Sequence, residues 1–219
     1  MDLSLPPALG QAVTGLDTAH LFALAAALGW ASGLRLYAVV FLTGLAGWLG
    51  WLPLPSGLHV LQHPAVLVAA GTMLAVEFLA DKIPWVDSLW DALHTFIRIP
   101  AGAALAAGVF GADAGAWTLI AALAGGGLAA TAHAAKTTVR AAANTSPEPF
   151  SNIGLSLLGD VAAPTLLWLA WEHAAWFWPV LGVVVVLSLV LIVVLFRFLR
   201  GLWKRFTGGP AAMNGVAAG

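Results

Sequence analysis

The chain has 219 residues, of which 61% are hydrophobic and only 9% are charged, and its mean hydropathy is +0.93. A soluble domain is usually about 45–50% apolar, so this composition excludes an ordinary soluble protein and indicates one embedded in a lipid bilayer. The net charge of -1 gives no reason to expect a nucleic-acid partner, and the absence of cysteine excludes disulfides, thiolate metal sites and cysteine nucleophiles.

The first predicted element follows a flexible lead, residues 1–17, which contains two prolines and two glycines. Asp17 or Thr18 is suited to cap a helix that continues to about residue 49. This apolar run is longer than the roughly 20 residues that one straight span needs. Two interpretations fit it: a single tilted helix, or a helix broken near residues 31–33.

The next two predicted elements lie before residue 112. A loop rich in proline and glycine, residues 51–63, precedes a helix that begins at Pro64 and ends at about residue 80. Residues 84–98 show helical periodicity with one polar face. Residues 99–111 form an apolar run too short to cross a bilayer alone, so we expect it to complete a span with the preceding segment, with a kink at Pro100.

Three further spans are predicted in the second half of the chain, at residues 117–136, 150–171 and 177–196, and the tail at 206–219 is expected to be disordered. The predicted fold class is therefore all-α. It is a polytopic helical membrane protein with about six transmembrane helices in a single domain, residues 18–205. The lipid bilayer is its first expected partner.

The Lys and Arg residues predict how these spans are oriented. With the four bases after residue 196 placed in the cytoplasm, counting back through six spans puts Lys82, Arg98, Lys136 and Arg140 on that side as well. Eight of the nine bases then obey the positive-inside rule. We therefore expect a multi-pass protein of the bacterial inner membrane with its N- and C-termini in the cytoplasm.

The two halves of the chain share a weak internal similarity. The segment ALGWASGLR (27–35) aligns with LAATAHAAK (128–136), and each is followed by a helix that carries an acid near a proline. Two halves of three helices, 18–112 and 116–205, would then have opposite orientations. Many secondary transporters are built from such an inverted repeat.

Polarity is concentrated in residues 76–98, where Asp87, Asp91, His94 and Arg98 follow the spacing i, i+4, i+7, i+11 and share one helical face. Two carboxylates and an imidazole on adjoining turns favour a metal site, or a proton relay through the histidine. The alternative is a helix that lies at the cytoplasmic surface with this face in water.

Arg35 and Asp160 are ionisable groups inside predicted spans. A guanidinium stays charged in proteins, so within a span it must meet a carboxylate, a bound anion or water. The candidate partners on other helices are Glu77, Asp81 and Asp160. Such contacts either bind a solute or form a structural ion pair that determines how the helices pack.

A second polar region begins in the fourth predicted span, where a basic face is followed by a polar stretch, residues 141–152, that contains two prolines. A non-helical polar stretch that ends at a helix N-terminus is suited to anions. The alternative is an ordinary cytoplasmic loop with a helix cap. The candidate residues of this region are His133, Lys136, Arg140, Asn144 and Asn152.

The most distinctive stretches of the chain are ASGLRLY (31–37), EFLADKIPWVDSLWDALHTFIRIPAG (77–102) and NTSPEPFSN with SLLGDVAAP (144–164). Together they resemble an uncharacterised integral-membrane family of bacteria and plants that is catalogued only as a domain of unknown function. The resemblance covers roughly residues 20–175. It implies a membrane location and no established activity, and it marks out Arg35, Glu77, Asp81, Lys82 and Asp160. Gly159 stands where members of that family often carry a further acid.

These features favour a small transporter or channel for a small polar or ionic solute, working through its two halves or as a homo-oligomer. Two other classes stay open: an intramembrane metal-dependent enzyme acting on lipid-linked substrates, and a non-catalytic membrane scaffold. No cofactor is identified. The candidate pathway residues are Arg35, Glu77, Asp81, Lys82, His133, Lys136, Arg140, Asn144, Asn152 and Asp160, and the metal candidates are Asp87, Asp91 and His94.

Overall fold

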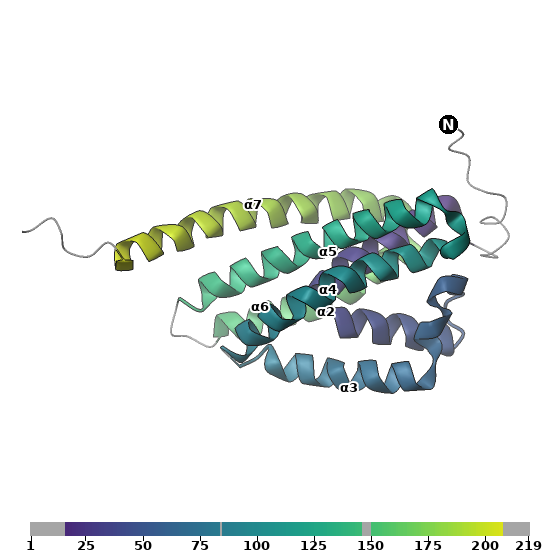
Figure 1. The fold of residues 1–219 in the computed structure, drawn as a ribbon, viewed down its shortest axis with the longest axis horizontal. Helices are drawn as coiled ribbons and strands as arrows, with labels where there is room; N and C mark the ends of the chain where they lie inside the picture. The colour runs from purple at the N-terminus through teal and green to yellow at the C-terminus, as the bar shows by residue number, and fades with distance from the viewer. Residues whose placement is uncertain (1–15, 84, 146–149, 208–219) are drawn as a thin grey trace, which may run out of the picture.

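The computed structural model describes residues 16–83, 85–145 and 150–207, and within these ranges every regular element is a helix (Figure 1). The elements in chain order are α2 (Thr18–Trp48), the 3-10 helix η1 (Ser56–Gln62), α3 (Pro64–Ala80), α4 (Val86–Phe110), the 3-10 helix η2 (Ala112–Ala114), α5 (Ala116–Ala143), α6 (Phe150–Glu172) and α7 (Ala174–Thr207). Five helices are long and apolar enough to cross a membrane, and η1 with α3, bent by 69°, would make a sixth. The prediction of a polytopic helical membrane protein is confirmed.

Local sequence signals explain several of the helix boundaries. The Asp17 carboxylate caps α2 by accepting a 2.9 Å hydrogen bond from the backbone amide of His20. Pro64 lies in the first turn of α3, where its missing amide hydrogen costs nothing. Gly111 ends α4 with a φ of 73°, a conformation that glycine adopts without strain. Helix α4 contains Pro100, so the amphipathic segment and the short apolar run form one helix, as expected.

Helix α2 is broken at Arg35, where the backbone leaves the helical conformation (φ −143°, ψ 70°). The arm before the break lies along α5, with Gly29 against Gly125 and Gly33 against Ala129. Because these contacts advance together along both helices, this arm and α5 run in the same direction. Of the two interpretations of the long apolar run, the broken helix is therefore correct, with the break just beyond the predicted residues.

The arm of α2 after the break returns toward the end of the bundle from which the helix came (Figure 1). It lies antiparallel to α3, because Gly71 is beside Phe41 while the earlier residue Leu67 is beside Gly44. Residues of both arms line one cavity of about 290 Å³ near their open ends. Helix α2 is thus a re-entrant hairpin whose tip is Arg35.

The hairpin does not fit two expectations drawn from the sequence, namely that both termini lie on the cytoplasmic side and that the two halves form an inverted repeat. Helices α3 to α7 cross the bundle in alternating directions, so the beginning of α2 and the end of α7 lie at opposite ends of the bundle and not on one side (Figure 1). The aligned segments 27–35 and 128–136 run in the same direction, whereas an inverted repeat requires opposite directions. An apolar run of 31 residues is more than long enough to cross a bilayer, and only its packing shows that it folds back.

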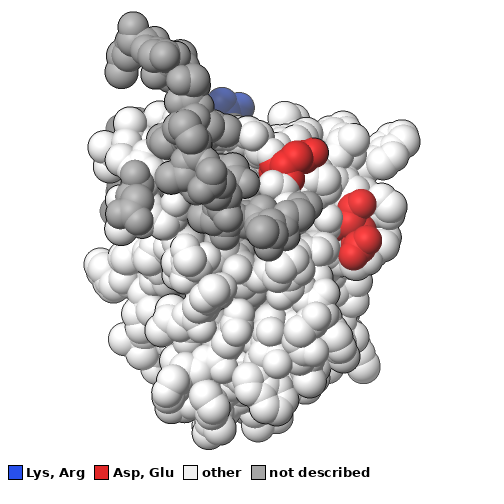
Figure 2. Space-filling model, turned by 90° about the vertical axis from the view of Figure 1, so that its right-hand side faces the viewer, with Lys and Arg blue, Asp and Glu red and all other residues white. Residues whose placement is uncertain are grey.

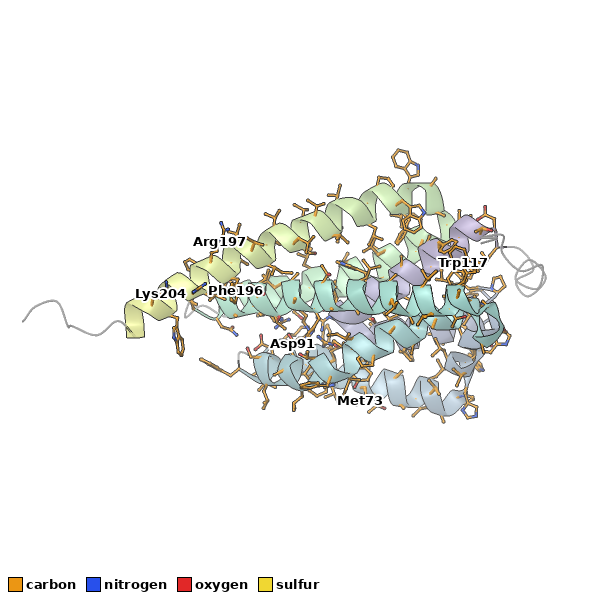
Figure 3. All side chains as sticks on the ribbon, turned by 45° about the horizontal axis from the view of Figure 1, so that its top comes forward. Met73, Asp91, Trp117, Phe196, Arg197 and Lys204 are labelled. Atoms are coloured by element: carbon orange, nitrogen blue, oxygen red, sulfur yellow. The ribbon has the colours of Figure 1, made fainter. Side chains whose placement is uncertain are left out.

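The outer surface of the bundle is apolar. Val183, Val186, Val190 and Val193 of α7 are each about half exposed, which suits contact with lipid chains and not with water. Figure 2 views the end of the bundle at which α2 begins, and few charged side chains are visible there. Figure 3 shows Trp117 near this end and Arg197 and Lys204 near the other.

Candidate functional site

Ten ionisable side chains from α2, α3, α4, α5, α6 and the α3–α4 turn form one connected set of ion pairs, which we call the charged cluster. It contains five carboxylates and five bases, so its formal charges cancel: Glu77, Asp81, Asp87, Asp91, Asp160, Arg35, Lys82, Arg98, Lys136 and Arg140. The cluster lies in the half of the bundle where α3 and α5 end and where α4 and α6 begin. In Figure 3, Asp91 lies among the helices of this half.

Arg35, at the tip of the α2 hairpin, joins three parts of the chain. One terminal nitrogen, Nη1, donates to the Asp81 carboxylate. The other, Nη2, lies 2.8 Å from Asp160 Oδ1 and donates to the backbone oxygen and the hydroxyl of Ser156, at 3.0 and 2.9 Å. The third nitrogen, Nε, is buried and has no hydrogen-bond partner among the described residues.

Asp160 is the more accessible carboxylate of the Arg35 site. Its side chain is 21% exposed, whereas Asp81 is fully buried. Its second oxygen lies 3.7 Å from Lys82 Nζ, and that ammonium also donates to the backbone oxygen of Phe78 at 3.2 Å. Burial lowers the pKa of Lys82, and the nearby Asp160 carboxylate opposes that effect.

Arg98 forms the second node of the cluster, deep in α4. Its Nη2 lies 2.5 Å from Glu77 Oε1, and its Nη1 lies 2.8 Å from Asp91 Oδ1. The Arg98 and Glu77 side chains are both fully buried, and Asp91 is 2% exposed. These buried charges persist only because each has an opposite charge beside it, with Lys136 as the second base next to Asp91.

Lys136 and Arg140 of α5 connect the two nodes. Lys136 Nζ lies 3.3 Å from Asp81 and 2.8 Å from Asp91. Arg140 Nη1 donates to Asp87 at 2.7 Å and to the backbone oxygen of Asp81 at 2.8 Å. Asp81 therefore receives contacts from Arg35, Lys136 and Arg140, and it is the hub of the cluster.

The two histidines of the candidate list lie beside the cluster and not in its ion pairs. His133 Nδ1 lies 3.3 Å from Arg98 Nη1, a donor, so this nitrogen is an acceptor and Nε2 donates to Thr95 Oγ1 at 2.7 Å. His94 Nδ1 donates to the Trp90 carbonyl at 2.8 Å, its Nε2 is 3.1 Å from the Tyr37 hydroxyl, and its ring stacks on Trp90.

The expectations for the polar face of α4 need correction. Asp87, Asp91 and Arg98 are 0–2% exposed, so the alternative of a water-facing surface helix was wrong. Asp87 binds Arg140, Asp91 binds Arg98 and Lys136, and His94 contacts Tyr37, so the three metal candidates point to different partners. Across the described ranges, no three His, Asp or Glu side chains are placed to hold a metal ion. The bases of α5 already use the carboxylates that a metal would need.

The predicted polar loop contributes less than expected. Asn144 donates to the Ser88 hydroxyl at 3.1 Å, at the edge of the cluster. The side chain of Asn152 lies outside the described residues, and so does Glu148. Sequence reasoning missed Ser156, which binds Arg35 and lies 3.4 Å from Lys82 Nζ. Its position four residues before Asp160, on the same helical face, was the available signal.

The chain is similar in sequence to a family of proteins. A family model described as Domain of unknown function (DUF4126) matches residues 22–199. No curated protein and no solved structure matches the chain.

Proposed function

We propose that this chain, which belongs to the family described as Domain of unknown function (DUF4126), is a small membrane carrier that moves an anionic solute together with a proton. The observation that carries this proposal is the break of α2 at Arg35, inside the bundle, next to two carboxylates. Secondary transporters use broken helices in the same way, because the interrupted helix brings ionisable groups and backbone to a solute in the membrane.

Asp160 supplies the proton-binding step of the proposal. It lines a cavity of about 580 Å³ between α2 and α3, whose other walls include Ala38, Leu74 and Phe78. This cavity gives protons a route to Asp160 that the fully buried Asp81 lacks. Ionisable groups inside membrane spans commonly mark ion and proton pathways.

Protonation of Asp160 changes what Arg35 can bind. The proton neutralises the carboxylate that faces Nη2, so the guanidinium keeps Asp81 as its only carboxylate partner among the described residues. An anionic solute then replaces the lost negative charge at Nη2, where Ser156 still accepts hydrogen bonds. Loss of the proton from Asp160 restores the ion pair and displaces the anion, so the two species bind together.

Reconstituted liposomes test this function directly. An inward proton gradient should drive uptake of a small anion from a panel of chloride, nitrate, phosphate and acetate, with matching internal acidification read by a pH-sensitive dye. Asp160→Asn should lower the coupled flux about tenfold or more, because the neutral amide cannot exchange a proton. Asp17→Asn is the matched control, since Asp17 caps α2 and contacts the His20 ring at the other end of the bundle. Wild-type flux no greater than that of empty liposomes, for every anion, would overturn the proposal.

The charge balance of the cluster favours a second candidate, a non-catalytic scaffold in which the ion pairs only determine helix packing. The two candidates differ in what Asp160→Asn changes. A carrier loses flux while its unfolding temperature in detergent stays close to that of wild type, because Arg35 keeps Asp81. A scaffold shows no flux at all, and the substitution lowers its unfolding temperature.

The distribution of bases supports an orientation in the bacterial inner membrane. Lys82, Lys136, Arg140 and the bases of α7 lie toward one end of the bundle, and Arg197 and Lys204 are seen there in Figure 3. The opposite end shows few charged side chains (Figure 2). By the positive-inside rule, the basic end faces the cytoplasm, and the open end of the α2 hairpin faces the other side.

A further inference from the structure

A further cavity, of about 410 Å³, opens between α2, α5, α6 and α7, and it shares no lining residue with the cavity at Asp160. Most of its walls are aliphatic, including Leu155 and Leu158 of α6 and Val184 and Leu187 of α7. Leu158 and Leu187 are also more than half exposed on the outside of the bundle. The cavity therefore opens sideways, toward the space that lipid chains occupy around a membrane protein.

The inner wall of this cavity is lined by basic side chains. Arg35, Lys136 and Arg140 line it, and among the described residues no acidic side chain does. The Arg35 Nε–H is a buried donor with no partner among the described residues, on a side chain only 1% exposed. A Cβ atom at position 159 would lie 3.6 Å from this nitrogen, so Gly159 is what leaves the donor open to the cavity. An unpaired N–H of a charged group in apolar surroundings is costly unless a ligand accepts from it.

We propose that this cavity binds one long-chain carboxylate, a free fatty acid, with its head group on Arg35 Nε and its chain between α6 and α7. A carboxylate supplies the acceptor that Arg35 Nε lacks, whereas the terminal nitrogens of this guanidinium already face Asp81 and Asp160. The volume of about 410 Å³ lies in the lower part of the range for ligand pockets, roughly 300–1,000 Å³, which suits one chain and not two. Ser188 adds no free donor, because its hydroxyl already donates to the Val184 carbonyl at 2.8 Å. The fatty-acid head group meets Nε of Arg35, whereas the proposed transport step uses Nη2.

The test uses purified full-length protein in nanodiscs and a palmitate analogue that carries a photoreactive diazirine. Irradiation should label peptides of α6 and α7, and unlabelled palmitate should compete. Gly159→Leu fills the space in front of Nε and should lower labelling about tenfold. Gly154→Leu is the matched control on the same helix, because a side chain there meets nothing within 4 Å and should leave labelling unchanged. Ala162→Leu, one turn further along the same cavity wall, should repeat the effect of Gly159→Leu.

The head group is tested by competition. Methyl palmitate has the same chain without a charge and should compete about tenfold more weakly than palmitate. Unfolding temperatures of all variants are measured in parallel, and labelling is compared among those that match wild type. Undiminished labelling of folded Gly159→Leu or Ala162→Leu would overturn the site. Equal competition by methyl palmitate, or tighter competition by a lysophospholipid, would overturn its assignment to a free carboxylate.

Discussion

At the scale of single residues, the charged cluster illustrates how charges are tolerated inside a membrane protein. Arg98, Glu77 and Asp91 are almost fully buried, and each depends on the others for its partners. A buried ion pair contributes little net stability against an apolar replacement of both groups, but removing one partner strands the other. The cluster is therefore most sensitive to single substitutions at its nodes.

Arg98→Ala should be strongly destabilising. It leaves the Glu77 and Asp91 carboxylates without their guanidinium in a buried site, which typically costs about 3–5 kcal/mol. Denaturant unfolding in detergent, followed by circular dichroism, measures the free energy of unfolding. Arg200→Ala removes the same side chain from an exposed position on α7 and should change that free energy little. Equal losses of unfolding free energy in the two variants would show that breaking the buried Arg98 ion pairs is no more costly than removing an exposed arginine.

Ser156→Ala should have a smaller effect. It removes the hydroxyl that accepts from Arg35 Nη2 at 2.9 Å, while the Ser156 backbone oxygen at 3.0 Å remains. A lost hydrogen bond to a buried charged group costs about 1.5–3 kcal/mol, and the remaining acceptor should keep the loss at the low end. The same unfolding measurement applies. Thr165→Ala on the exposed face of α6 is the control, because its hydroxyl donates to the Val161 carbonyl of its own helix. If Thr165→Ala lowers the free energy of unfolding as much as Ser156→Ala does, the Ser156 hydrogen bond to Arg35 has no special role in stability.

At the scale of elements, glycine sets how closely α2, α4 and α5 approach. A Cβ on Gly29 would come within 2.6 Å of Gly125 Cα, and one on Gly102 would come within 2.6 Å of the Ala129 methyl. Small residues at helix contacts are the usual means by which membrane helices pack closely, because lipid chains supply no hydrophobic force between them. This close packing brings the first arm of α2 into the bundle and positions Arg35 next to Asp81 and Asp160.

Gly125→Ala and Gly127→Ala form a matched pair on α5. A Cβ on Gly125 would collide with Ala106 and lie 2.8 Å from the Gly102 carbonyl, whereas one on Gly127 meets nothing within 4 Å. We expect the first substitution to destabilise by about 1–3 kcal/mol through overpacking. The second should be neutral or stabilising by up to about 1 kcal/mol, because alanine is the better helix former. Thermal unfolding of both variants measures the difference, and the opposite ranking would contradict the packing of α4 on α5.

At the scale of the whole molecule, the α2 hairpin determines which parts of the chain share a side of the membrane. A straight first span would place Thr18 and Trp51 on opposite sides. The hairpin places the beginning of α2 and η1 at the same end of the bundle, and the end of α5 and the beginning of α6 lie at the other (Figure 1). The straight span and the hairpin both place the loop after α2 on the outer side of the membrane. They differ in the side on which Thr18 lies, so its position distinguishes them.

Cysteine labelling decides between these topologies, since the chain has no cysteine of its own. We expect a membrane-impermeant maleimide added to intact cells to label Thr18→Cys and Trp51→Cys, but to label Thr145→Cys only after the cells are opened. All three residues are exposed in the structure, so accessibility within the fold is matched. Protection of Thr18→Cys together with labelling of Trp51→Cys would restore the straight span.

Much of this architecture follows from the sequence alone. Hydropathy and helix signals predict a polytopic helical protein and place the beginning of α3 and α6 at Pro64 and Phe150. The spacing of Asp87, Asp91, His94 and Arg98 predicts that they share a face of α4. These features are local, because they depend on the period of the helix and on the amount of apolar sequence that a bilayer requires.

Tertiary structure alone decided what that face contacts and where α2 turns. An amphipathic helix presents its polar side equally well to water or to other charges, and only the bases of α5 opposite Asp87 and Asp91 show which applies. The reversal at Arg35 depends on the close contact of Gly29 with Gly125 and on the carboxylates of Asp81 and Asp160. Contacts between residues far apart in the sequence leave no local pattern, so composition and periodicity determine the class of protein, and packing determines the site.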